Sequence, residues 1–333
     1  MEPRTVYRAA IWSLAQLALI LLAGPKADAK CVSTAQIQQL GGALQCRNLG
    51  KLSVSLKEMP NNCHSQGLAV DSSVTVSCMD RSDSSAAYMV VFPRPGDTGK
   101  AFKYKVGNSY RHPSAFQFLG DKTAVAFAPN SPNGQSQIRF FDLKNQELVP
   151  AEDATIMAPT HIGALAFGRV GELETLIGCA WDCNDWAVWT RKAGSRAFTA
   201  TSVRKPKEHT DHRGLDSGVG AYNSLFLTTR CEDKQPLLFA SHGTWLDVWE
   251  LSGVGTADLR LKKIMKRNFK SVFHPGINLF HEGMTLFWNG GQLEIMAAPH
   301  DFKTEGCGPG LRCTPGLYSC TAAGGAKAGP GAN

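Results

Sequence analysis

The feature that most limits how this chain can fold is an internal repeat of short, strand-like segments. Four segments open with a histidine and continue as an apolar run: His64–Val70, His112–Phe118, His161–Phe167 and His274–Phe280. A fifth segment, Gly218–Phe226, has the same pattern with glycine in the histidine position. The openings recur roughly every 50 residues, which is typical of folds built from one supersecondary unit per repeat.

Each opener is followed by further apolar or alternating runs of strand length, separated by turn-forming residues. This pattern predicts about four strands in each unit. In the fifth unit we expect Thr285–Trp288 as the second strand and Leu293–Ala297 as the third. A fourth strand is missing there, because the sequence from Asp301 onward is rich in glycine, proline and cysteine. A spare strand, Leu52–Lys57, precedes the first unit.

Five units of four strands resemble the β-propeller superfamily, although the signature of no specific family is present. A propeller has to pair its last blade with its first or leave an exposed sheet edge, so we expect the N-terminal strand to complete the last blade. The predicted fold is therefore all-β: a five-bladed β-propeller with an N-terminal strand closing the last blade and disulfide-stapled termini. The alternative is a two-domain β-sandwich protein whose strands are similar by chance.

The N-terminus has the pattern of an export signal. Arg4 and Arg8 precede the apolar run Ala9–Ala23, and Ala27 and Ala29 are the small residues that signal peptidase requires. The run is shorter than the roughly 20 residues of a membrane span, and no other segment could cross a bilayer. We therefore expect a secreted protein, the alternative being an uncleaved anchor.

These features divide the chain into four parts. We expect a signal peptide over 1–29, a disulfide-held cap over 30–50, the propeller over 51–303, and a Cys-rich hairpin with a flexible tail over 304–333. The best helical candidate, Ser33–Leu44, lies in the cap.

The ten cysteines favour disulfides, because their number is even and the predicted compartment is oxidising. Cys179 and Cys183 are spaced for a local bridge, whereas the other pairings stay open. A structural zinc site is disfavoured, since Cys307, Cys313 and Cys320 are spaced more widely than usual zinc ligands.

The charge balance narrows the partners. The net charge of +7 is mild, and no dense cluster of lysine and arginine is present. Nucleic acid is therefore not an expected partner. We expect a glycan or an extracellular protein as the partner, and a monomeric protein.

The recurrent histidines are predicted to meet at one rim of the channel, because the first strands of a propeller line the channel and run the same way. The channel-rim residues are His64, His112, His161 and His274. They could satisfy backbone carbonyls in the turns between blades. Alternatively, they could become cationic near about pH 6 or bind a divalent metal such as Zn²⁺, Cu²⁺ or Ni²⁺. We expect no other cofactor.

A second candidate for metal binding is the loop cluster Glu208–His212. Its two histidines do not have the spacing of a helical HExxH motif, and glycines follow soon after. A solvated loop is the alternative.

The second strands should end on the same rim, where each blade contributes a short polar residue near an aromatic one. An indole face suits the C–H face of a sugar, and amides or carboxylates hydrogen-bond its hydroxyls. The alternative is that these residues only form turns and pack between blades. The predicted ligand-binding residues are Trp181, Trp186, Trp245, Trp288, Asp80, Asn130, Asp182, His242 and Asn289.

Cleavage of a glycosidic bond needs paired carboxylates near the channel. The catalytic candidates are Asp80 and Asp182 in outer loops, whereas Asp71 and Glu172 should lie towards the opposite rim. The starts of the inner strands carry histidine, glycine and proline instead. The sequence therefore predicts a secreted, non-enzymatic binding protein that recognises carbohydrate or a protein partner on one rim. The alternative is a secreted polysaccharide hydrolase or lyase that uses rim carboxylates.

Overall fold

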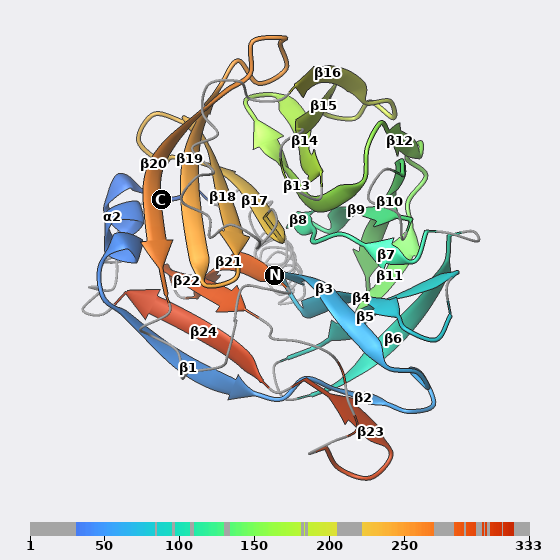
Figure 1. Ribbon diagram of the computed structural model, residues 1–333. Helices are drawn as coiled ribbons and strands as arrows, with labels where there is room; N and C mark the ends of the chain where they lie inside the picture. Colours follow the sequence, from blue (N-terminus) through green and yellow to red (C-terminus); the bar gives the residue numbers. More distant parts are fainter. Residues whose placement is uncertain are drawn as a thin grey trace, which may run out of the picture.

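The chain forms five sheets arranged around a common axis, a five-bladed β-propeller (Figure 1). The computed structural model describes residues 31–83, 85–94, 97–106, 110–129, 134–180, 183, 186–204, 222–269, 283–289, 291–297, 302, 304, 307–314 and 316–322. The predicted signal peptide lies outside these residues. The prediction of an all-β propeller is confirmed.

The first four blades follow one another along the chain. Blade one contains β3 (Cys63–Val70), β4 (Val74–Asp80), β5 (Ala86–Phe92) and β6 (Thr98–Lys105). Blade two contains β7 (His112–Pro113), β8 (Gln117–Leu119), β9 (Lys122–Ala128), β10 (Ser136–Lys144), β11 (Glu147–Pro150) and β12 (Ile156–Ala158). Blade three contains β13 (Ile162–Val170), β14 (Leu173–Ala180), β15 (Trp186–Lys192) and β16 (Thr199–Arg204). Blade four contains β17 (Ser224–Thr229), β18 (Pro236–His242), β19 (Trp245–Ser252) and β20 (Arg260–Asn268).

The middle strands of the blades are apolar on both faces. All seven residues of β5 are buried, and the last six residues of β14 are buried as well. This follows from the architecture, because each blade is covered on both faces by its neighbours, as buried sheets are in general. The apolar runs that indicated strands in the sequence are therefore the packing surfaces between blades.

Blade five is assembled from both ends of the chain. It contains β21 (Met284–Asn289), β22 (Gln292–Ala297), β24 (Leu317–Ala322) and, at its outer edge, β1 (Leu44–Gly50). The antiparallel pairing of β1 with β24 runs from Leu44 opposite Ala322 to Gly50 opposite Leu317. Closure by an N-terminal strand is thus confirmed, and the propeller reaches beyond the boundaries 51–303 that the sequence predicted.

The strand that closes the propeller differs from the predicted one. Leu52–Lys57 contributes β2 (Ser53–Ser55), which pairs with β6 of blade one and with β23 (Leu311–Cys313). In blade five, Thr285–Trp288 belongs to the innermost strand rather than the second. The prediction shifted this blade by one strand because it took the Cys-rich C-terminal stretch for a hairpin or plug, whereas that stretch supplies β23 and β24.

The N-terminal segment before the propeller is anchored to blades four and five. Helix α2 (Thr34–Gly41) begins with a capping box, in which Gln36 N donates to Ser33 Oγ (3.1 Å) and Ser33 N donates to Gln36 Oε1 (2.9 Å). The helix packs beside β20 and β24.

Cys307 is disulfide-bonded, and four further disulfides join described residues. They are Cys31–Cys231, Cys46–Cys320, Cys63–Cys78 and Cys179–Cys183. The last of these confirms the predicted local bridge. None of the helical segments that the structure describes is long and apolar enough to span a membrane.

The innermost strands form a ring in the order β3, β8, β13, β17, β21, with β21 next to β3 again. Glycines allow close approach at this ring. A Cβ atom on Gly67 would lie 2.5 Å from Ala115 Cα, and one on Gly168 would lie 3.0 Å from Leu227 Cγ. Because the inner strands all run the same way, the ring has a start rim, where these strands begin, and an end rim, where they finish.

Candidate functional site

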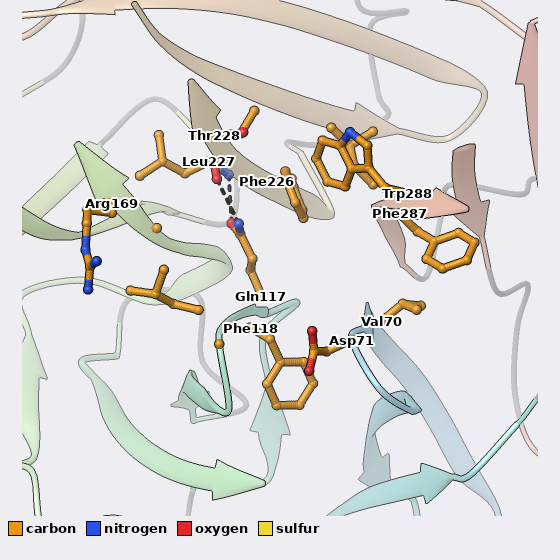
Figure 2. A pocket seen from close by; sticks show the side chains of 14 residues that line it. Val70, Asp71, Gln117, Phe118, Arg169, Phe226, Leu227, Thr228, Phe287 and Trp288 are labelled. Atoms are coloured by element: carbon orange, nitrogen blue, oxygen red, sulfur yellow. Dashed lines mark hydrogen bonds between the residues drawn. The ribbon is translucent and has the colours of Figure 1, made fainter. Parts of the chain in front are cut away.

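A hollow with a cavity volume of about 90 Å³ lies on the axis at the end rim and opens to solvent. We call it the central pocket (Figure 2). All five blades contribute to it through their innermost strands or the turns that follow. Its lining residues are Val70, Asp71, Gln117, Phe118, Leu119, Gly120, Gly168, Arg169, Phe226, Leu227, Thr228, Leu286, Phe287 and Trp288.

The axis is closed at this depth by Gln117. Its side-chain Nε2 donates to the carbonyl of Leu227 (2.8 Å), and the backbone N–H of Leu227 donates to its Oε1 (2.7 Å), as the dashed lines in Figure 2 show. Gln117 belongs to blade two and Leu227 to blade four, which are not neighbours in the ring. The buried amide therefore crosses the axis and makes the hollow a pocket rather than an open channel.

Aromatic side chains form part of the wall. The rings of Phe226 and Trp288, from the inner strands of blades four and five, have centroids 6.2 Å apart and planes tilted by 43°. Phe118 and Trp288 are each half-buried, so part of each ring reaches solvent. Partly exposed aromatic faces of this kind suit the apolar face of a sugar ring.

Two side chains of opposite charge complete the pocket. Asp71 is exposed in the turn after β3, where its backbone N–H donates to the carbonyl of Ser73 (3.0 Å). Arg169 is exposed near the end of β13, and its Nη2 lies 3.6 Å from Glu174 Oε1. In Figure 2, Arg169 and Trp288 lie on opposite sides of the hollow, with Gln117 between them.

Most of the predicted rim residues that the structure describes lie away from the central pocket. Asp80, at the end of β4, is fully buried, and its Oδ1 accepts hydrogen bonds from the backbone N–H groups of Ser82 (2.8 Å) and Asp83 (3.0 Å). Asn61 Nδ2 donates to its other oxygen (3.2 Å). The carboxylate therefore caps a turn at the start rim.

The predicted aromatic residues have three different environments. Trp186 is 3% exposed and packs against Tyr222, with ring centroids 6.2 Å apart. Trp245 is half-buried beneath Lys266, whose Nζ is 4.6 Å from the ring centroid. Trp288 lines the central pocket. The three tryptophans thus do not gather into one surface.

Two further predicted ligand-binding residues have hydrogen-bonding neighbours in their own blades. His242 Nδ1, at the end of β18, lies 3.3 Å from Asn223 Oδ1, and the residue is buried. Asn289, at the end of β21, donates through Nδ2 to Glu294 Oε1 (3.0 Å). Trp288 and Asn289 therefore lie at the end rim, not at the start rim that the sequence predicted, because β21 is an inner strand.

The histidines that the structure describes do meet at the start rim. The rings of His112 and His161 have centroids 5.6 Å apart, and His64 Nδ1 lies 3.3 Å from Arg81 Nη2. Burial lowers the pKa of His112 to about 3, with further contributions from His161, His64 and Arg111. Among the residues in view, no group of three or more His, Cys, Asp or Glu side chains could hold a metal ion.

Several predicted residues lie outside the described ranges. They are Trp181, Asp182, Asn130, His274 and the cluster Glu208–His212.

The sequence did not single out Gln117, Arg169 or Phe226 as site residues. The predicted polar residues belong to the rim where the inner strands start, whereas the pocket lies where these strands end. These three residues could have been predicted from their position. Each lies in or near the last residues of an inner strand, and in a propeller the ends of the inner strands converge on the axis.

The class of protein that this architecture defines is a five-bladed β-propeller with a pocket at the end rim. No family profile matches the chain, and no curated protein does so either. Among solved structures, the major allergen Mala s 1 of Malassezia sympodialis is similar at 9% identity, over 77% of this chain and 92% of that chain, with a TM-score of 0.45.

Two further similar structures are enzymes or carry an enzymatic name. The α-L-arabinofuranosidase of Podospora anserina, solved with cellotriose, matches at 9% identity over 83% of this chain and 98% of its own, with a TM-score of 0.44. The hemagglutinin-neuraminidase ectodomain of parainfluenza virus 5 matches at 7% identity over 96% of both chains, with a TM-score of 0.47. All three TM-scores are below 0.5, so the fold assignment rests on the strand pairing of this chain.

The prediction of a non-enzymatic binding protein was wrong. It rested on the absence of carboxylates from the inner strands and gave no weight to Asp71, which directly follows β3 and lines the central pocket. Several other similar structures are glycoside hydrolases, also at TM-scores below 0.5.

Proposed function

We propose that the protein is an exported, carbohydrate-active hydrolase whose reaction takes place in the central pocket, with Asp71 as a proton-transfer residue. The observation that carries this proposal is the placement of Asp71 in one pocket with the partly exposed indole of Trp288. The disulfides are in keeping with export to an oxidising compartment.

The proposed division of labour follows from the chemistry of glycoside hydrolysis. A sugar ring stacks on Trp288 or Phe118 in the pocket. Asp71 accepts a proton from the attacking water as the water oxygen bonds to the anomeric carbon. The glycosidic oxygen leaves with the bonding electrons and has to receive a proton from a second group.

The candidates for that second group are Asp121 and Glu172. They occupy the turns after the inner strands of blades two and three, as Asp71 does in blade one, and both are exposed. All three carboxylates are therefore on the end rim.

A second candidate function is polysaccharide lyase activity, which the presence of one carboxylate and one guanidinium among the lining residues favours. In elimination from a uronic acid, a base removes the proton next to the carboxylate, a double bond forms, and the glycosidic oxygen leaves and is protonated. A cation beside the sugar carboxylate stabilises the developing charge. Asp71 and Arg169 offer one base and one cation.

The test is a turnover assay on a panel of soluble polysaccharides. Released reducing ends report either cleavage, and the ultraviolet absorbance of an unsaturated uronate separates lyase from hydrolase. Asp71→Asn should lower turnover by about 10²–10⁴-fold, because a positioned proton-transfer group contributes that much. Asp97→Asn is the matched control, since Asp97 is an exposed aspartate elsewhere in blade one.

The two variants should have the same unfolding midpoint as the parent protein. Retention of full turnover by Asp71→Asn would overturn the assignment of Asp71. Sugar binding without turnover on any substrate would overturn the enzymatic proposal itself.

A further inference from the structure

We propose that the central pocket selects sugars that carry a carboxylate, and that Arg169 is the residue that pairs with it. This inference rests on the proposed function, because it names the substrate class of the same pocket. It concerns specificity and holds for either kind of bond cleavage.

Arg169 lies at the pocket end of a chain of ion pairs between blades two and three. Arg191 Nε donates to Glu174 Oε2 (2.7 Å), and Arg191 also pairs with Asp153, which in turn pairs with Lys122 Nζ (2.7 Å). Arg169 approaches the other oxygen of Glu174 at the longer distance of 3.6 Å. This ion-pair network therefore contains three cations and two carboxylates. Its one excess positive charge belongs to one of the two end residues, Arg169 or Lys122.

Both end cations, Arg169 and Lys122, are partly exposed (47% and 32%), but only Arg169 lines the pocket. The three inner members of the network are largely buried: the exposed fraction is 13% for Glu174, 7% for Asp153 and 3% for Arg191. Their charges therefore neutralise one another in a poorly hydrated environment. The guanidinium of Arg191 is also 4.3 Å from the ring centroid of Phe198. Arg169 is 47% exposed and approaches the Glu174 oxygen that does not accept the hydrogen bond from Arg191 Nε. Arg169 is thus the cation of this ion-pair network that lines the pocket, and we assign it as the contact for an incoming anion.

The shape of the pocket then fixes what kind of anion fits. A guanidinium binds a carboxylate through two parallel hydrogen bonds, which sets the orientation of the sugar as well as its affinity. The pocket wall across from Arg169 is aromatic, through Trp288 and Phe226. A ligand that satisfies both sides has an apolar ring face and a carboxylate on its edge, which describes an acidic sugar.

The position of Asp71 favours this arrangement over a simple anion site. Its own negative charge repels an anion that would sit in the middle of the pocket, so binding is productive only when the carboxylate of the ligand lies towards blade three. The sugar carbons are then left facing Asp71. A free inorganic anion gains the contact with Arg169 without the stacking, and we expect it to bind weakly.

The experiment measures binding by calorimetry in an Asp71→Asn background, so that turnover does not consume the probe. The acidic probes are trigalacturonic acid and 3′-sialyllactose, which distinguish uronic from sialic acids. Methyl-esterified trigalacturonate and lactose are their neutral counterparts. We expect at least one acidic probe to bind about tenfold or more tightly than its neutral counterpart, as a charge-assisted hydrogen bond provides.

Substitutions assign the preference to its residue. Arg169→Gln should reduce the ratio of acidic to neutral affinity to about one, and Arg169→Lys should retain part of it because the charge stays but the planar fork is lost. Arg196→Gln is the matched control: Arg196 is a 78% exposed arginine of blade three that pairs with Glu152 away from the pocket. It should leave the ratio unchanged.

The outcomes separate this inference from the proposed function. Equal affinity for acidic and neutral probes, no binding of any probe, or an equal loss in Arg196→Gln would each overturn the role of Arg169. Turnover of a neutral glycan that depends on Asp71, without a preference for acids, would leave the enzymatic proposal standing alone. An Arg169-dependent preference without turnover on any substrate would support the pairing and contradict the enzymatic proposal.

Discussion

His112 illustrates how a junction between blades changes the chemistry of a single side chain. It is 8% exposed, its strand pairs with β9 so that it stands opposite Ala128, and its ring meets that of His161. Burial, followed by the charges of His161, His64 and Arg111, lowers its pKa from 6.5 to about 3. A proton on this ring would have to be held in a poorly hydrated site beside other cations.

This shift predicts loss of stability in mild acid. Between pH 6.5 and about 3 the unfolded chain binds a proton at His112 that the folded chain does not, so the free energy of unfolding falls as pH falls through this window. From pH 7 to pH 5 the contribution of His112 should be about 2 kcal/mol. Urea unfolding at the two pH values measures it.

The comparison that isolates His112 uses two variants. His112→Gln should lose most of this pH dependence, whereas His64→Gln, at a half-buried position, should keep most of it. An unchanged pH dependence in His112→Gln would show that another group is responsible.

The residues of the central pocket show what the sequence could and could not predict at this scale. Asp71 follows a strand and precedes two serines, so by sequence it is an ordinary turn residue. Gln117 has no local signal at all, because its partner Leu227 lies in another blade. The predicted site residues are mainly histidines and tryptophans, and of those that the structure describes only Trp288 lines the pocket.

At the scale of elements, the inner strands are held together by very close backbone contacts. Gly67 of β3 faces the segment before β8, where Ser77 Oγ also donates to the carbonyl of Ser114 (3.0 Å). A Cβ atom on Gly67 would lie 2.5 Å from Ala115 Cα and 3.0 Å from the carbonyl oxygen of Ser114. Both are backbone atoms of another blade, so the contact can be relieved only by moving the blades apart.

Gly67→Ala should therefore lower the free energy of unfolding by about 3 kcal/mol or more, at the upper end of overpacking effects. Gly41→Ala is the matched control, since its Cβ would meet only Met265 Sδ at an ordinary 3.8 Å in helix α2. There, alanine should stabilise the helix by up to about 1 kcal/mol. Denaturant unfolding of both variants tests the contrast, and a neutral Gly67→Ala would contradict the close packing of β3 on blade two.

The strands of blades one to four were predictable because each middle strand is apolar on both faces and is bounded by turn residues. Blade five was not, for a physical reason. Its third strand, β24, follows a stretch rich in glycine and cysteine, and its outer strand comes from the other end of the chain. A periodic pattern in the sequence cannot reveal a blade whose strands are not consecutive, so the prediction assigned Thr285–Trp288 to the wrong layer.

At the scale of the whole molecule, closure of the propeller depends on the contact between the two ends of the chain. Cys46 and Cys320 stand directly opposite each other in the pairing of β1 with β24, and a disulfide joins them. A second disulfide, Cys31–Cys231, ties the segment before β1 to blade four. Both link positions that are 200 or more residues apart in sequence.

A disulfide stabilises a protein largely by restricting the unfolded chain, and more so for longer loops. With Cys31–Cys231 intact, the loop that Cys46–Cys320 closes is roughly 100 residues long, which corresponds to about 5 kcal/mol. Cys63–Cys78 spans 15 residues within one hairpin and corresponds to about 3 kcal/mol. The closing disulfide should therefore matter more to the whole molecule than the local one.

Two paired substitutions test this expectation, Cys46→Ser with Cys320→Ser and Cys63→Ser with Cys78→Ser, each measured by denaturant unfolding under non-reducing conditions. Cys63 and Cys78 are both fully buried, whereas Cys46 is only partly so. If lost packing dominates, the variant without Cys63–Cys78 (the hairpin variant) should be the less stable one. If the entropy of chain closure dominates, the variant without Cys46–Cys320 should be the less stable one. A larger loss in the hairpin variant would mean that the pairing of β1 with β24 holds the ring closed without its covalent link.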